Sequence, residues 1–96
     1  MYTLILKPSY ERDVKTYLRH GGRKDRLQHV VDLLQSGEQL LPSLRDHQLL
    51  GKMRKFRELH VEGDWLLVYQ KDGKHLIISC IWLITHKKLH ERERDL

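Results

Sequence analysis

Apolar residues in the first third of the chain follow two periods, which predict a strand and then two helices. Tyr2 to Lys7 is apolar or β-branched, as is typical of a short strand, and Pro8 ends it. Apolar residues then recur at the spacing of one helical face in two segments: Tyr10, Val14, Tyr17 and Leu18, followed by Leu27, Val30, Val31 and Leu34. We therefore expect a hairpin of two amphipathic helices that end near Gly21-Gly22 and at Ser36-Gly37.

The next stretch, from Glu38 to Met53, has no regular period and contains Pro42 and Gly51. Both residues interrupt regular structure, so we expect a loop or an irregular connection here. A loop of this length in a small domain is often functional, which makes this segment a place to look for site residues.

Three further apolar runs cover Arg54 to Val61, Asp64 to Lys71 and Lys74 to Ile81. They are separated by Glu62-Gly63 and Asp72-Gly73, and an Asp-Gly pair between apolar runs is a strong signal for a β-hairpin. We therefore expect three consecutive strands that form an antiparallel meander.

The order strand, helix, helix, strand, strand, strand predicts an α+β fold. The helix hairpin should pack on one face of a mostly antiparallel sheet and leave the other face as an open, concave working surface. A chain of 96 residues has room for one modest core, so we expect a single domain over residues 1–96. The charged segment from Lys87 to Asp95 predicts either a short helix or a frayed tail.

Composition narrows the class of protein. No apolar run approaches the ~20 residues needed to cross a bilayer, so no contact with a membrane is expected. The first residues lack the features of a secretory leader, which favours the cytoplasm. Cys80 is the single cysteine, so an internal disulfide is excluded and a buried, inert thiol is expected. The net charge of +5 favours an anionic partner: nucleic acid, an acidic protein, or both.

Four short motifs occur in a fixed order. They are Asp46-His47-Gln48-Leu49-Leu50-Gly51, Arg57-Glu58-Leu59-His60, Asp64-Trp65-Leu66-Leu67-Val68-Tyr69 and Thr85-His86. Together they resemble the YafQ branch of the RelE toxin superfamily, whose members carry Asp-His-x-Leu-x-Gly, Arg-Glu/Asp-x-His, Asp-Trp-x-Leu-x-Tyr and a late Thr-His. The matches keep their order over about half the chain, and such a compound pattern is far more specific than any one motif.

This resemblance implies the toxin of a type II toxin–antitoxin system, an endoribonuclease that enters the ribosomal A site and cleaves messenger RNA. A cognate antitoxin, often an acidic protein with a DNA-binding end, would hold it inactive, so operator DNA would be reached only through the antitoxin. The positions that match the family's functional residues are His47, Glu58, His60, Asp64 and His86.

Chemistry independently favours the same residues. RNA cleavage without a metal needs a base for the ribose 2′-hydroxyl, an acid for the leaving 5′-oxygen, and positive charge near the phosphate. Histidine suits both proton transfers because its ordinary pKa is about 6.5. His86 is our first choice for acid or base, with His60 and His47 next, and Asp64 would orient an imidazole or contact the RNA.

Basic residues near these histidines are expected to bind the RNA phosphates. The predicted RNA-binding residues are Lys52, Arg54, Lys55, Arg57, Lys87 and Lys88. The first three should also attract the acidic part of the antitoxin, beside an open sheet edge and the two helices. No cofactor is expected. No metal is expected either, because the seven histidines include only the pair His86 and His90 at helical ligand spacing and there is no cysteine pair.

Two departures from the family leave alternatives open. Trp82 stands where the family usually has an arginine, and His90 stands where it usually has a phenylalanine. Loss of a charge-stabilising group would weaken cleavage. One alternative is therefore a catalytically weakened homologue that serves as antitoxin-binding partner and transcriptional corepressor. A second alternative is a relative of ParE that inhibits DNA gyrase. In a purely structural interpretation, Glu58 and His60 form a solvated ion pair and Asp64 is only a turn residue.

Overall fold

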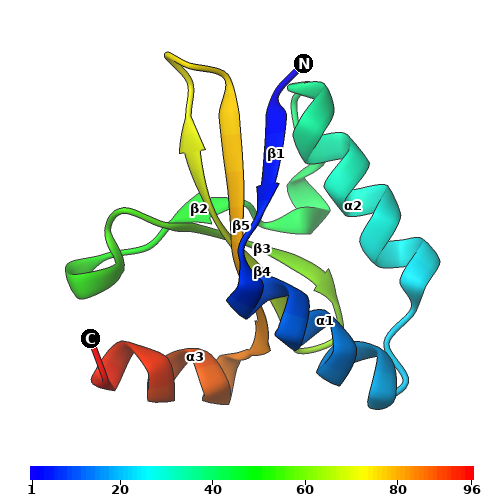
Figure 1. The fold of residues 1–96 in the computed structure, drawn as a ribbon, viewed down its shortest axis with the longest axis vertical. Helices are drawn as coiled ribbons and strands as arrows, with labels where there is room; N and C mark the ends of the chain where they lie inside the picture. The colour runs from blue at the N-terminus through cyan, green and yellow to red at the C-terminus, as the bar shows by residue number, and fades with distance from the viewer.

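The computed structural model describes residues 1–96 and shows a five-stranded sheet with helices on both faces (Figure 1). In chain order the elements are β1 (Thr3–Leu6), α1 (Pro8–Arg19), α2 (Lys24–Ser36), the 3-10 turn η1 (Pro42–Leu44), β2 (His47–Gln48), the 3-10 turn η2 (Gly51–Met53), β3 (Arg57–Glu62), β4 (Trp65–Asp72), β5 (Ile77–Thr85) and α3 (His86–Arg94). The strand order is β1-β5-β4-β3-β2, and only β1 and β5 run parallel. The predicted α+β class and the meander are confirmed.

The strands that follow the loop begin later than the sequence pattern predicted. β3 begins at Arg57 because η2 is followed by a turn at residues 54–55. β5 begins at Ile77, since the Asp72 carboxylate accepts hydrogen bonds from the amides of Lys74 and His75 and so closes a four-residue turn. The hairpin at Asp72-Gly73 is therefore present, with a longer connection than a two-residue turn.

The helix hairpin covers one face of the sheet, as expected. Tyr17 of α1 and Val30 of α2 are completely buried against side chains such as Leu67 of β4. The expectation that the opposite face is open is wrong in part. The charged C-terminal segment forms α3, which packs Leu89 against Leu66 and other apolar side chains of that second face.

An irregular pairing in β5 decides which side chains reach α3. Val68 pairs with Trp82, but Tyr69 pairs with Cys80, so Ile81 is left out of the ladder as a bulge. The Ile81 carbonyl instead accepts a hydrogen bond of 2.7 Å from the Ser9 hydroxyl. The bulge directs Cys80 to the face of α1 and α2, and Trp82 to the face of α3. Burial raises the pKa of Cys80 to about 12, as expected of an inert thiol.

A buried ion pair fastens α3 to α1. Both terminal nitrogens of Arg92 lie 2.8 Å from the carboxylate oxygens of Asp13, which also accepts the backbone N–H of Leu83 at 3.1 Å. The Arg92 guanidinium lies over the Trp82 ring, 5.4 Å from its centroid. This arrangement holds α3, and with it His86 at its first turn, in one position relative to the sheet.

Candidate active site

A cleft of about 320 Å³ opens between the loop that contains β2, the strand β3 and the helix α3. Its lining includes His47 from β2, Glu58 from β3, and both His86 and His90 from α3. His60 adjoins it, because its ring centroid lies 5.5 Å from that of His86. Three of the predicted catalytic residues thus share one cleft with a fourth beside it.

His47 and Glu58 form the first pair in this cleft. They are directly opposite each other in the β2–β3 register, and His47 Nε2 lies 3.0 Å from Glu58 Oε1. His47 Nδ1–H donates to the carbonyl of Arg45 at 2.8 Å. The Glu58 side chain is only 7% exposed, and its other oxygen, Oε2, has no hydrogen-bond partner. A buried polar atom without a partner is costly, so this oxygen is an unfavourable feature of the site's packing.

His60, His86 and Asp64 form the second group. His86 Nδ1–H donates to the carboxylate of Asp64, which stands in the turn before β4. This bond holds the pKa of Asp64 below its usual range, so the carboxylate stays charged at neutral pH. Partial burial lowers the pKa of His60 from 6.5, and positive charge at His86 and Arg45 adds to the effect, against the opposing influence of Glu58. His60 is therefore a neutral imidazole near pH 7.

The same side chains also offer a set of metal ligands. One ligand atom each from Glu58, His60 and His86 lies within 4.8 Å of the others. Two imidazoles and a carboxylate suit Zn²⁺ or Cu²⁺. These ions bind their ligand atoms at about 2 Å, so the three side chains would need to move only slightly closer together to hold one. Sequence spacing did not indicate the cluster, because Glu58 and His60 lie two residues apart on β3 whereas His86 lies in the distant helix α3.

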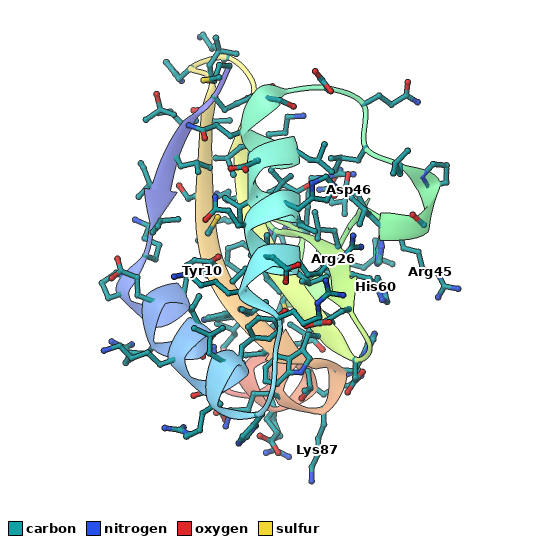
Figure 2. All side chains as sticks on the ribbon, turned by 90° about the vertical axis from the view of Figure 1, so that its right-hand side faces the viewer. Tyr10, Arg26, Arg45, Asp46, His60 and Lys87 are labelled. Carbon is teal, nitrogen blue, oxygen red and sulfur yellow. The ribbon has the colours of Figure 1, made fainter.

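The predicted RNA-binding residues do not all gather at this cleft. Arg57 lies on the opposite face of the sheet, where its guanidinium binds Asp46 at 2.8 Å. Alternation along β3 causes this, because neighbouring residues of a strand point to opposite faces. Lys87 extends away from His60 in Figure 2, and Lys88 lies 3.4 Å from the carboxylate of Glu91. Lys52, Arg54 and Lys55 are exposed in and beside η2.

Arg45 is the cation that the sequence interpretation missed. Its carbonyl holds His47, and its charge acts on His60. Figure 2 shows its side chain extending from the loop on the side of the molecule where His60 lies. Its backbone is left-handed, with φ of 52°. The only sequence signal was its position directly before the Asp46-His47 motif, in a segment without periodicity.

Trp82 is a packing residue in this structure. Its ring meets Phe56 edge-on at 5.6 Å and lies beneath the guanidinium of Arg92. Arg92 is itself engaged by Asp13. Neither side chain therefore supplies positive charge to the cleft in place of the family's arginine.

Comparisons with known proteins agree with this geometry. The sequence model of a family described as the bacterial toxin of a type II toxin-antitoxin system, YafQ, matches residues 2–91. The mRNA interferase toxin YafQ of Escherichia coli K12 is 34% identical over 68 residues, which cover 70% of this chain and 74% of that protein.

Solved structures show the same likeness. A copper-bound mutant toxin from Helicobacter pylori superposes with a TM-score of 0.84 at 34% identity, over 93% of this chain and 99% of that one. E. coli YafQ in its complex with DinJ superposes with a TM-score of 0.81 at 26% identity, over 92% and 96% of the two chains. The chain belongs to the YafQ family of bacterial type II toxins, and the resemblance inferred from its motifs is confirmed.

Proposed function

We propose that this toxin is an endoribonuclease that cleaves messenger RNA on the ribosome by histidine acid–base catalysis. The observation that carries the proposal is the convergence of His60 and His86 beside the buried side chain of Glu58. The ring centroids of the two histidines lie 5.5 Å apart. The E. coli relatives, which are mRNA interferase toxins, support messenger RNA as the substrate. Because ribosomes are the proposed site of cleavage, we propose that the protein acts in the cytoplasm.

The environments of the two imidazoles support different roles for them. His60 has a lowered pKa and is neutral near pH 7, so it takes the proton from the ribose 2′-hydroxyl. The 2′-oxygen then attacks phosphorus, and the bond to the 5′-oxygen breaks. His86 gives its proton to that leaving oxygen, while the charged Asp64 orients the ring. The products are a 2′,3′-cyclic phosphate and a 5′-hydroxyl.

Glu58, His47 and Arg45 complete the site. Both ring nitrogens of His47 face oxygen atoms, the carbonyl of Arg45 and Glu58 Oε1, and these contacts hold the ring in the cleft. The charge of Arg45, which acts on His60, would stabilise the negative charge that develops on the phosphate. Glu58 holds His47 in the cleft through Oε1, 3.0 Å from His47 Nε2. Lys52, Arg54 and Lys55 would guide the RNA from the exposed η2 segment.

Primer extension on a defined messenger RNA in purified ribosomal complexes tests this proposal. His60→Ala and His86→Ala should each abolish the cut, whereas His29→Ala, an exposed histidine of α2, should cleave like the wild type. Folded His60→Ala and His86→Ala proteins that still cut would refute the assignment. Growth arrest with intact transcripts and inhibited supercoiling would instead support a ParE-like gyrase inhibitor. Absence of cutting by the wild type, with antitoxin binding retained, would indicate a corepressor.

Copper offers a separate probe of the same cluster. Helicobacter pylori relatives are solved in copper-bound and metal-bound forms. We expect Cu²⁺ to bind Glu58, His60 and His86 here, and thereby to inhibit cleavage by occupying the nitrogens that transfer protons. Isothermal titration should show that His60→Ala weakens copper binding. Unchanged copper affinity in that variant would place the ion elsewhere.

The antitoxin is proposed to dock on the helix hairpin. A groove of about 460 Å³ between α1 and α2 is lined by apolar side chains and flanked by Lys15 and Lys24. It suits an amphipathic acidic helix. The solved toxin–antitoxin complex of YafQ with DinJ from E. coli supports an antitoxin as the partner. The loop around β2 lies on the other side of the molecule (Figure 1), so the antitoxin groove and the catalytic cleft could be occupied at the same time. Charge reversal at Lys15 and Lys24 should weaken antitoxin affinity more than reversal at Lys52, Arg54 and Lys55.

A further inference from the structure

Three residues of the sequence motifs meet behind the cleft, on the face of the sheet that α1 and α2 cover. The carboxylate of Asp46 receives Arg57 Nη2 at 2.8 Å and Nε at 3.4 Å, and it also accepts the hydroxyl of Tyr69. The Tyr69 side chain is 1% exposed, and burial followed by the bond to Asp46 raises its pKa, so the hydroxyl remains a donor. We call Asp46, Arg57 and Tyr69 the rear cluster.

The rear cluster is joined to the cleft through single peptide units. Asp46 directly precedes His47, and Arg57 directly precedes Glu58. In the sheet, Arg57 pairs with Tyr69, while Glu58 pairs with His47 on one side and with the residue before Tyr69 on the other. Each contact behind the sheet is therefore one residue away from a contact in the cleft.

The loop that carries His47 has few other attachments. β2 consists of two residues, and the connection before it enters the core through Leu44, which is 2% exposed. Beyond β2, the amide of Leu49 donates to the carbonyl of Phe56 at 2.9 Å. His47 itself is 52% exposed and is held by two hydrogen bonds only. Its position therefore depends strongly on the anchored carboxylate of Asp46.

We propose that the rear cluster is a positioning device, in which Asp46, held by Arg57 and Tyr69, fixes His47 against Glu58 for catalysis. Arg57 acts through Asp46 and does not contact the RNA phosphates. This inference rests on the proposed function, because its main effect is expected in RNA cleavage.

Loss of the rear cluster should lower the rate of the chemical step rather than substrate binding. A displacement of about 1 Å of a catalytic group can cost on the order of a hundredfold in rate, so Asp46→Ala should reduce kcat by about ten- to a hundredfold with KM almost unchanged. Tyr69→Phe removes one of three donors and should have a smaller effect of the same kind. A residue in contact with phosphate behaves differently, since its loss raises KM and weakens the salt dependence of binding.

A double-mutant cycle with His47→Ala separates these possibilities. If Asp46 acts through His47, Asp46→Ala should lower kcat in the wild-type background but change it by less than about twofold when His47 is already alanine. Arg57→Ala should behave in the same way. Equal losses in both backgrounds, or a rise in KM alone for Arg57→Ala, would overturn the inference.

Hydrogen exchange gives a readout that does not need activity. Exchange of the Leu49 amide should accelerate in Asp46→Ala and, less, in Tyr69→Phe, which keeps the ring in the core. The matched control is Asp25→Ala, an aspartate that pairs with Arg23 at 2.8 Å on the exposed surface. It should leave both exchange and kcat unchanged. Wild-type protein that fails to cut RNA would refute the proposed function, while unchanged exchange in Asp46→Ala would refute the rear cluster.

Discussion

The contact between Asp64 and His86 offers a direct test of the catalytic assignment. Asp64→Asn keeps the size of the side chain and removes its charge, so the His86 ring loses the acceptor that orients it and the negative charge that stabilises its protonated form. We expect folding to be unaffected, because the Asp64 side chain is 59% exposed and makes no contact with the core.

The exposure of the pair sets the size of the effect. In a buried triad, replacing the orienting aspartate with asparagine lowers kcat by about 10⁴. Here the His86 side chain is also 46% exposed, and water screens an ion pair of this kind. We therefore expect a loss on the order of tenfold in the rate of cleavage, well above the effect of a purely solvated pair and well below that of a buried triad.

Single-turnover cleavage of messenger RNA in programmed ribosomes measures this rate. The wild-type carboxylate stays charged between pH 6 and pH 8 because the pKa of Asp64 is lowered, so titration of Asp64 does not contribute to the difference in this range. Asp72→Asn is the matched control, since Asp72 pairs with His75 at 2.8 Å on a distant turn. Equal rates for the wild type and Asp64→Asn would show that Asp64 does not act through His86.

Three further predictions follow from other contacts. The acid limb of the pH–rate profile should lie below pH 6.5, because protonation of His60 there removes the base. Glu58→Gln should move this limb to still lower pH, because the charge of Glu58 raises the pKa of His60. Asp13→Ala should lower the free energy of unfolding in urea by about 2 to 4 kcal/mol, because it leaves Arg92 and a β5 amide without their partner. Trp82→Arg should not increase cleavage and should lower the melting temperature, since it places a second cation beside Arg92.

Much of the fold was predictable because its signals are local. The helical stripes, the glycine stops and the Asp72-Gly73 break each act within a few residues, and each produced the expected element. The role of the charged C-terminal segment could not be decided in this way. A single apolar residue, Leu89, docks α3 on the second face, and the ion pair that holds the helix joins residues 13 and 92.

The sequence by itself determined the order of the elements, the family, and the residue types from which the cleft is made. Only the tertiary structure decided that Arg57 faces away from His60, that the charge of Arg45 acts on His60, and that Glu58, His60 and His86 meet. The reason is physical: alternation along a strand is local, but strand pairing and helix docking decide which face meets which neighbour. Those contacts join residues far apart in the chain, and no local pattern encodes them.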